Sequence, residues 1–378
     1  MQSLLIGLDI GGVNIKCSSI PRAFDKKLED AYSTKKYFPL WQNSRDKLPA
    51  IIAEILSEHV SYWQTWENEE QTTRIHICAS ITGELSDAYT TKKEGIIHIT
   101  GSLHEACKKM QARKMSLEIM DPIFISTDGM LYNIDDAVTN YRSVAAANWH
   151  ATAIWVGSFV KDCILVDCGS TTTDIIPIIE GMPVSEGLTD FARLASGELV
   201  YTGVLRATIP SITHEVPVNG AMIPVSFEKF ALMADVHMIL GNITFEQYDC
   251  DTADGRSTSI DNCIKRLARS VCEDAEDLGY TNIIEMARFL HQKQVDMVWD
   301  GLQKVLMHLL LNSGISAADL DCVITGLGED ALAKLASTRA GFRSIIPLSS
   351  KIGMNATIIS SAIGVIHVLA EHLNQGAD

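Results

Sequence analysis

The chain has 378 residues, 47% of them hydrophobic and 21% charged, and is therefore long enough for two domains with substantial cores. Its net charge of −16 excludes a non-specific nucleic-acid binder, because a polyanion would be repelled. The nine cysteines lack the spacing of a zinc site or a disulfide framework, which favours a reducing compartment. With neither a signal peptide nor an apolar run of about 20 residues, we expect a cytoplasmic protein that does not enter membranes.

The first half of the sequence predicts alternating strands and helices. Apolar runs predict strands over residues 4–10, 14–20, 75–81 and 123–126. Apolar residues at helical spacing predict a helix over residues 48–60. Small residues predict a further helix over 143–150, and a strand is expected over 151–156. This order is typical of an α/β domain with a partly parallel sheet.

The second half repeats the strand pattern and then becomes helical. Strands are predicted over residues 163–167, 174–180 and 320–325, and helices over 227–240, 259–278, 281–312, 330–336 and 355–373. We therefore expect an N-terminal lobe, residues 1–155, on which the helix 355–373 packs. A C-terminal lobe, residues 156–354, would carry a helical insertion at about 225–315.

Two strands end in an aspartate that is followed by a glycine turn. The first has the sequence DIGGVNIK from Asp9, and the second has DCGSTTTD from Asp167. Glycines let backbone N–H groups approach an anion, and hydroxyl or amide side chains add further donors. A strand that ends in Asp and Gly is also a common tight turn. Repetition of the pattern, more than either copy, favours two halves of one phosphate clamp.

These turns suggest a set of anion and metal ligands. We expect Asp9 and Asp167 to hold Mg²⁺, directly or through water. The groups that would donate to phosphate oxygens are Gly11, Gly12, Asn14, Gly169, Ser170, Thr171 and Thr172, together with Gly326 and Gly328 of a third glycine turn. Lys16 either adds a positive charge to the same oxygens or is a strand-end lysine in solvent.

Three carboxylates outside the metal pair are catalytic candidates. Glu84 and Asp87 follow the strand 75–81, and either is a candidate general base. Asp174 follows the hydroxyl run of the second turn. It either faces the site or forms an Asx-turn in its own loop.

Two further segments are candidates for substrate binding. Asp254 and Arg256 lie in the loop DTADGR, residues 251–256, where the arginine could bind a carboxylate. A solvated turn is the alternative for this loop. Trp149 either stacks on an aromatic substrate ring or is a buried core residue.

The three glycine turns resemble the first phosphate, second phosphate and adenosine elements of the actin, sugar-kinase and heat-shock ATPase superfamily. This resemblance implies two ribonuclease-H-like lobes around a central cleft. The second turn and the segment LASGELVYTG, residues 194–203, resemble the hydantoinase A/oxoprolinase branch. Short matches along nearly the whole chain resemble the proteins of tetrahydromethanopterin-linked one-carbon transfer, which include methanofuran biosynthesis. These matches are residues 81–85, 146–149, 234–236 with 240–241, and 250–256.

The narrower resemblance implies methanofuran or methylofuran biosynthesis. The implied enzyme is an ether-forming transferase. It joins an aminomethyl-furan-methyl diphosphate to the phenol of γ-glutamyl-tyramine, or of a tyrosine analogue, and releases diphosphate. The glycine turns would then bind the diphosphate, with Mg²⁺ as cofactor. The partners would be small molecules, with no nucleic acid and no membrane, and a homodimer is one alternative for the assembly.

Other functions stay open at this point. An ATP-dependent small-metabolite kinase would use the same turns, and an ATP-dependent amidohydrolase subunit of the hydantoinase A type would need a partner subunit. A nucleotide-sensing scaffold would be non-catalytic. Val13 and Asn14 stand where superfamily kinases often carry Thr or Ser, and the third turn has only two glycines, separated by Leu327. Both departures favour a ligand other than ATP.

Overall fold

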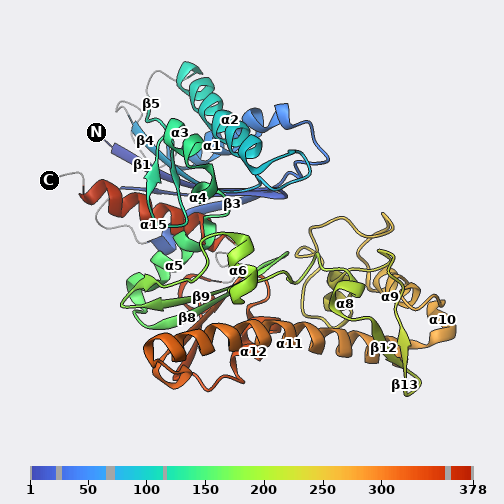
Figure 1. Cartoon of the computed structure of the whole chain (residues 1–378). Coiled ribbons are helices and arrows are strands. Elements are labelled where there is room, and N and C mark those ends of the chain that lie inside the picture. The colour runs from blue at the N-terminus through green and yellow to red at the C-terminus, as the bar shows by residue number, and fades with distance from the viewer. Residues whose placement is uncertain (1, 23–27, 65–72, 114–116, 354–358, 376–378) are drawn as a thin grey trace. The chain divides into compact units, whose positions relative to one another are not determined.

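The computed structural model describes residues 2–22, 28–64, 73–113, 117–353 and 359–375. The contacts between residues divide the chain into two compact units, and each unit is built from segments that are separated in the sequence. Figure 1 shows the whole chain. The first unit contains Met1–Asp162, Ile178–Ala192 and Ser349–Asp378, and the second contains Cys163–Pro177 and Arg193–Leu348. Both mixed sheets are combined with helices, which confirms the α/β class expected from the sequence. Within the described ranges, no helix is long and apolar enough to cross a membrane.

The sheet of the first unit has the strand order β3-β2-β1-β4-β6-β7, and β5 also pairs with β4. The strands are β1 (Gln2–Gly11), β2 (Asn14–Pro21), β3 (Tyr32–Tyr37), β4 (Thr73–Thr82), β5 (Leu117–Ile119), β6 (Ile123–Ile125) and β7 (Leu131–Tyr132). β1 pairs antiparallel with β2 and parallel with β4. The turns that follow β1 and β4 therefore lie at the same edge of the sheet.

Helices cover both faces of this sheet (Figure 1). The helices of this unit are α1 (Leu48–Gln64), α2 (Lys92–Arg113), α3 (Ile134–Thr139), α4 (Tyr141–Val144), α5 (Asn148–Phe159), α13 (Ser349–Ile352) and α15 (Ser360–Gln375), with 3₁₀ turns at Leu28–Asp30 and Arg45–Lys47. Ile6 and Leu8 of β1 belong to the core shared with α1 and α2. Leu5 belongs to the opposite core with Ile366 of α15. Burial on both faces explains why β1 is apolar throughout.

The second sheet has the order β10-β9-β8-β14-β15, and β11 pairs with β9. Its strands are β8 (Cys163–Cys168), β9 (Thr173–Ile179), β10 (Met182–Pro183), β11 (Leu199–Val200), β14 (Asp321–Thr325) and β15 (Ser344–Pro347). β14 is parallel to both β8 and β15. The unit boundaries near residues 177 and 192 fall inside β9 and α6.

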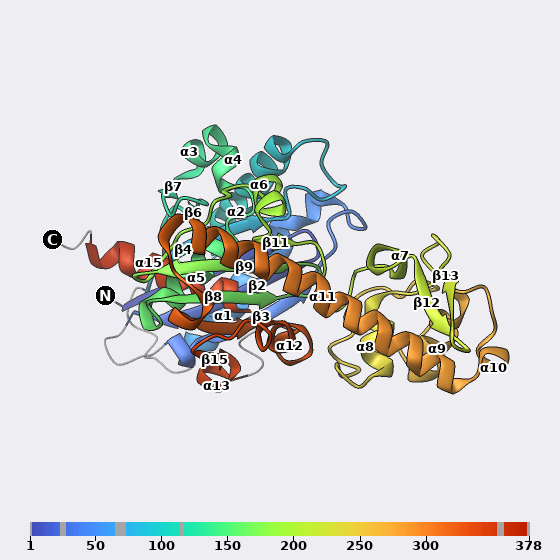
Figure 2. The same ribbon diagram turned by 60° about the horizontal axis from the view of Figure 1, so that its bottom comes forward.

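A helical insertion follows β11, and a long helix joins it to the second sheet. The insertion contains α7 (Ile209–Ile212), β12 (Glu215–Val218), β13 (Ala221–Pro224), α8 (Met233–Ile239), α9 (Ile260–Arg269) and α10 (Ala275–Leu278), and the long helix is α11 (Tyr280–Ser313). Outside it, α6 (Asp190–Ser196) precedes β11, a 3₁₀ turn at Ala317–Asp319 precedes β14, and a π-helical turn at Glu329–Ala333 leads into α12 (Lys334–Ser337). Figure 2 shows α11 extending from the sheet strands to α8, α9 and α10. Met233, Leu267 and Leu290 form part of the core between these helices.

The predicted strand 151–156 is wrong, because these residues belong to α5. Five of the six residues 151–156 are buried, so the segment has no amphipathic period that separates a helix from a strand. The predicted helix 143–150 is interrupted as well. α4 ends at Val144, and Ala146 has a φ of 54° before α5 begins.

Three later helices differ from their predicted ranges. The helix predicted over 227–240 is limited to α8, because Leu232 is extended and its N–H donates 2.9 Å to Asp235 Oδ2. The helix predicted over 259–278 is split into α9 and α10, with Cys272 at a φ of 61° between them. The helix predicted over 330–336 begins as a π-helical turn. Residues 355–358 of the predicted last helix lie outside the described residues.

Candidate functional site

The first glycine turn follows β1, where polar side chains surround Asp9. Asp9 Oδ2 accepts a 2.6 Å hydrogen bond from Ser361 Oγ of α15, and Oδ1 accepts a 3.1 Å bond from Thr82 Oγ1 of β4. Lys16 Nζ lies 3.5 Å from Asp9 Oδ2, because β2 places Lys16 directly opposite Asp9. Lys16 is therefore an ion-pair partner beside the turn, and its role toward a phosphate stays a prediction.

Gly11 ends β1, Gly12 lies in the turn and Asn14 begins β2. The carbonyl oxygen of Gly12 accepts a 2.8 Å hydrogen bond from the N–H of Leu40. Asn14 is buried, and its Oδ1 atom has no hydrogen-bond partner among the described residues. Such an atom is unusual in a folded protein and marks a place for a water or ligand. Anion binding by this turn stays a prediction.

Sequence patterns do not single out Ser361. It lies in the first turn of an apolar helix, where a serine resembles a small core residue. Its position relative to Asp9 depends on a contact between residues 352 positions apart. The pair Ser360 and Ser361 at the start of an otherwise apolar helix is the available sequence signal.

Glu84 lies in the turn after β4, next to the first glycine turn. Its side chain is buried, and no described residue donates a hydrogen bond to its Oε2 atom. Burial raises the pKa of Glu84 to about 7, and the carboxylates of Asp190 and Asp9 add to this rise. Lys92 and the backbone N–H of Glu84 act in the opposite direction. Asp87 of the same turn is exposed. Glu84 thus combines burial with a pKa suited to proton transfer near neutral pH.

The second glycine turn follows β8 in the second unit. β8 and β14 are parallel, and Asp167 stands opposite Thr325, so the turns after both strands lie at one edge of the sheet. The N–H of Gly169 donates a 2.9 Å hydrogen bond to the carbonyl of Thr172. This bond closes the turn over the intervening residues Ser170 and Thr171.

The third glycine turn packs directly on the second. The N–H of Gly328 donates a 2.9 Å hydrogen bond to the carbonyl of Cys168. Gly326 has a φ of +91°, and a Cβ atom on it would lie 2.5 Å from Asp167 Oδ1. Only glycine fits this position. The structure therefore brings the residues predicted in these two turns together within one unit.

A segment that sequence reasoning did not assign to the site also lies against the second turn. The N–H groups of residues 204–206 donate hydrogen bonds of 3.0 to 3.1 Å to the carbonyls of Gly169 and Ser170. A Cβ atom on Gly203 would lie 2.6 Å from the backbone nitrogen of Thr171. Gly203 is the last residue of the segment 194–203, which resembles the hydantoinase A/oxoprolinase branch. That resemblance is the sequence signal that could have assigned Gly203 to the site.

Asp174 of β9 is engaged by a buried arginine. Arg193 Nη2 lies 2.9 Å from Asp174 Oδ1 and also donates 3.1 Å to the carbonyl of Glu198. This pair ties β9 to the end of α6. An Asx-turn is not needed to explain the side chain, and catalysis by Asp174 stays a prediction.

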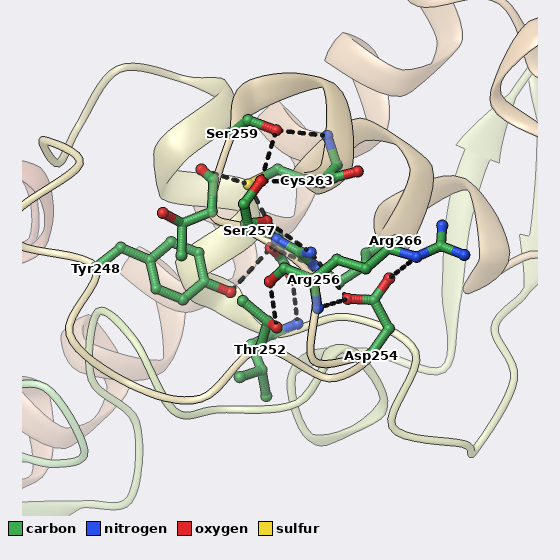
Figure 3. A network of polar contacts seen from close by, with 12 residues as sticks. Tyr248, Thr252, Asp254, Arg256, Ser257, Ser259, Cys263 and Arg266 are labelled. Atoms are coloured by element: carbon green, nitrogen blue, oxygen red, sulfur yellow. Dashed lines mark hydrogen bonds and ion pairs between the residues drawn. The ribbon is translucent and has the colours of Figure 1, made fainter.

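The loop 251–256 is held in place by Arg266 of α9 (Figure 3). Arg266 is fully buried, and its Nη1 donates 3.0 Å to Asp254 Oδ1. Its Nε donates 2.8 Å to Asp235 Oδ1 of α8, which also accepts a 2.9 Å bond from Tyr248 Oη. These hydrogen bonds compensate the cost of burying the charges of Arg266 and Asp235.

Asp254 and Arg256 have different surroundings in this loop. Burial would raise the pKa of Asp254, but the hydrogen bond from the Arg256 N–H and the Arg266 guanidinium outweigh it, so the pKa lies below its ordinary value. The side chain of Arg256 is 57% exposed. Asp254 thus stabilises the loop through its hydrogen bonds, whereas the Arg256 guanidinium reaches solvent. Substrate binding by both residues stays a prediction.

Trp149 is a core residue of α5, with 3% of its surface exposed. Its ring meets the ring of His150 edge-on, at a centroid distance of 5.1 Å. This burial favours the core alternative for Trp149 over stacking on a substrate, which stays a prediction.

The donor set fits Mg²⁺ better than a metal that needs several protein ligands. Across the described residues, no group of three or more His, Cys, Asp or Glu side chains is placed to hold a metal ion. Mg²⁺ usually keeps several waters and is bound by one or two carboxylates together with substrate phosphates. Asp9 in the first unit and Asp167 in the second are each a carboxylate of this kind, and metal binding by either stays a prediction.

The chain belongs to the hydantoinase/oxoprolinase family, whose sequence profile matches residues 77–366. A "(4-{4-[2-(gamma-L-glutamylamino)ethyl]phenoxymethyl}furan-2-yl)methanamine synthase" of Methanocaldococcus jannaschii is 32% identical to it, over 99% of this chain and 100% of that protein. A protein of the same name from Methanococcus vannielii is 33% identical, over 57% of this chain and 93% of that protein. The narrower family resemblance expected from the sequence is confirmed.

A solved structure shows the same fold. Nucleotide-free acetone carboxylase superposes with a TM-score of 0.56 at 11% identity, over 97% of this chain and 70% of that chain. This likeness confirms the actin-like ATPase fold expected from the three glycine turns.

The burial of Glu84 predicts a pH dependence of stability. Its folded pKa of about 7 exceeds the model-compound value of 4.5, so the free energy of unfolding falls as the pH rises through this window. The fall due to Glu84 is on the order of 3 kcal/mol. The free energy of unfolding is measured in urea at pH 4.5 and at pH 8. Between these two pH values it should fall less for the variant Glu84→Gln than for the wild type. The exposed Glu105→Gln variant should behave like the wild type, and equal pH dependence for all three proteins would contradict the prediction.

Removing the charge that holds the loop 251–256 should be costly. Arg266→Met leaves Asp235 buried without its counter-charge and is expected to cost about 3 to 5 kcal/mol in the free energy of unfolding. Lys265→Met, which removes a surface ion pair of 2.7 Å with Asp261, should cost less than about 1 kcal/mol. Similar losses in the two variants, measured by denaturant unfolding, would show that the network contributes little.

Proposed function

We propose that this protein is an ether-forming transferase that joins an aminomethyl-furan-methyl diphosphate to the phenol of γ-glutamyl-tyramine, or of a tyrosine analogue, with release of diphosphate. The observation that carries the proposal is the relative from Methanocaldococcus jannaschii, which aligns over its full length and whose name describes a phenoxymethyl-furan product. A phenoxymethyl group is an ether between a phenol oxygen and a methyl carbon. In the proposed reaction, the enzyme makes that oxygen–carbon bond.

The proposed step balances with diphosphate as the leaving group. The phenol oxygen forms a bond to the furan-methyl carbon, while the bond from that carbon to the diphosphate oxygen breaks. Diphosphate leaves with the electron pair, and the phenolic proton passes to a base. A furan-methyl carbon supports this chemistry, since the ring oxygen stabilises positive charge developing on the carbon. The protein has to neutralise the diphosphate and exclude water.

The second glycine turn supports diphosphate binding. Residues 170–172 offer backbone N–H groups and three hydroxyls around the turn that the Gly169 N–H closes, and Gly326 keeps the neighbouring turn close to Asp167. In the first unit, the Lys16 ammonium and the Asp9 carboxylate form a second charged position beside a glycine turn. When bound, Mg²⁺ would supply positive charge to the leaving diphosphate.

Glu84 is the proposed proton acceptor. A free phenol has a pKa near ~10, so a base with a pKa of about 7 takes the proton as the ether bond forms rather than before it. Burial of the carboxylate keeps competing water away. Asp87 is exposed and therefore lacks the environment that raises the basicity of Glu84.

Arg256 is the proposed contact for the glutamyl end of the acceptor. A γ-glutamyl group keeps a free α-carboxylate, and arginine binds carboxylates through two parallel hydrogen bonds. The Arg256 side chain is exposed and its backbone is fixed by Asp254, so the guanidinium is presented on an ordered loop.

The direct test is phosphorus NMR on the purified chain with Mg²⁺, the furan-methyl diphosphate and γ-glutamyl-tyramine. Free diphosphate should appear only when the phenol is present. A parallel tube with ATP tests the kinase alternative, and formation of ADP without release of diphosphate would return the protein to the kinases.

The two aspartates of the glycine turns should be essential for turnover. Asp9→Asn and Asp167→Asn each remove a negative charge proposed to hold Mg²⁺, and kcat is expected to fall at least about 100-fold in each, the scale of a lost electrostatic contribution. The exposed carboxylates Asp135 and Asp300 provide matched Asp→Asn controls that should keep the wild-type rate. Wild-type rates in both test variants would remove the metal proposal.

A further inference from the structure

A network of buried, hydrogen-bonded polar groups connects the helical insertion to the second glycine turn. Its centre is Gln294, which is fully buried in the middle of α11 among apolar residues. Gln294 Nε2 donates 2.7 Å to the carbonyl of Gly203 and 2.8 Å to Thr202 Oγ1. Its Oε1 atom lies 2.8 Å from Nε2 of His237 on α8. Every side-chain hydrogen-bonding group of the amide is thus engaged, as burial of an amide requires.

The direction of each hydrogen bond in this network follows from the group at one end, the carbonyl of Gly203. The Gly203 carbonyl can only accept, so the amide nitrogen of Gln294 must face it, and the amide oxygen must face His237. His237 Nε2 therefore carries the proton, and its Nδ1 accepts a 3.1 Å bond from Asn242 Nδ2. Burial lowers the pKa of His237 to about 4, which keeps the ring neutral, and the two hydrogen-bond partners set its tautomer.

The Gly203 end of this network lies against the second glycine turn. Gly203 is followed by the three N–H groups of residues 204–206 that bind the carbonyls of Gly169 and Ser170. Thr202 is held from the other side, because its carbonyl accepts a 2.9 Å bond from Thr173 Oγ1 of β9. A shift of Gly203 would therefore displace the turn itself.

We propose that Gln294 is a positioning residue for the second glycine turn, and that His237 fixes the orientation of its amide from the helical insertion. The inference deepens the proposed function and rests on it where diphosphate binding is concerned. Gln294 touches no substrate in this account. It sets the position of the residues 203–206 and, through them, of the donors that bind diphosphate.

The test compares Gln294→Met with Gln292→Met in the full chain. Both variants make the same change on α11, but Gln292 is exposed and its Nε2 donates 3.0 Å to Asp296 Oδ1 on the surface. In hydrogen exchange without ligand, the amides of residues 204–206 should exchange at least tenfold faster in Gln294→Met and at the wild-type rate in Gln292→Met. In calorimetric titration with inorganic diphosphate and Mg²⁺, the affinity should fall at least tenfold in Gln294→Met alone.

A second variant keeps the test valid if Gln294→Met does not fold. Gln294→Leu keeps a side chain of similar size but cannot donate to the Gly203 carbonyl, so it should show the same faster exchange. His237→Gln restores a donor to the Gln294 amide and should bind diphosphate more tightly than His237→Leu.

The outcomes separate the two claims. Unchanged exchange at residues 204–206 in both Gln294 variants would overturn the positioning role. Equal diphosphate affinity of the wild type and Gln294→Met would do the same and leave the proposed function standing. Faster exchange in the variants of a protein that binds no diphosphate would support the positioning role and sink the proposed function.

Discussion

Parallel strand pairing is the constraint on which the candidate site depends. In each unit, two parallel strands end side by side, β1 with β4 and β8 with β14, so the turns that follow them must share an edge. This places Asp9 beside Thr82 in one unit and Asp167 beside Gly326 in the other. A one-residue change of register in either pair would turn these side chains to the opposite face of the sheet.

Buried polar groups give the turns their fixed geometry. Asp9 is held by hydroxyls from β4 and α15, and the second turn is held through Gly203 by an amide on α11. Glu84 differs, because its buried carboxyl oxygen has no donor among the described residues and its pKa is raised. Groups that are fully hydrogen-bonded stabilise the fold, whereas a buried carboxylate with one oxygen that lacks a donor lowers stability. A cost of this kind is typical of a group retained for chemistry.

Sequence reasoning predicts the parts of this molecule that repeat a local pattern. Apolar runs such as 4–10 and 163–167 are strands, and the glycine turns after them are found where expected, because strand and turn preferences act over a few residues. The pattern fails over 151–156, where burial on all sides removes the period that marks a helix. It also fails at Ser361 and Gln294, whose roles come from contacts with residues far away in the sequence. A lone serine or glutamine in an apolar helix carries no local sign of its partner.

The proposed reaction transfers an alkyl group from diphosphate to a phenol oxygen. The most direct measurement uses γ-glutamyl-tyramine with ¹⁸O in its phenol group and follows the label by mass spectrometry. For alkyl transfer, we expect all of the ¹⁸O to be retained in the ether product and none to enter the released diphosphate. Label in a phosphorylated phenol or in phosphate would show attack at phosphorus and would contradict the account.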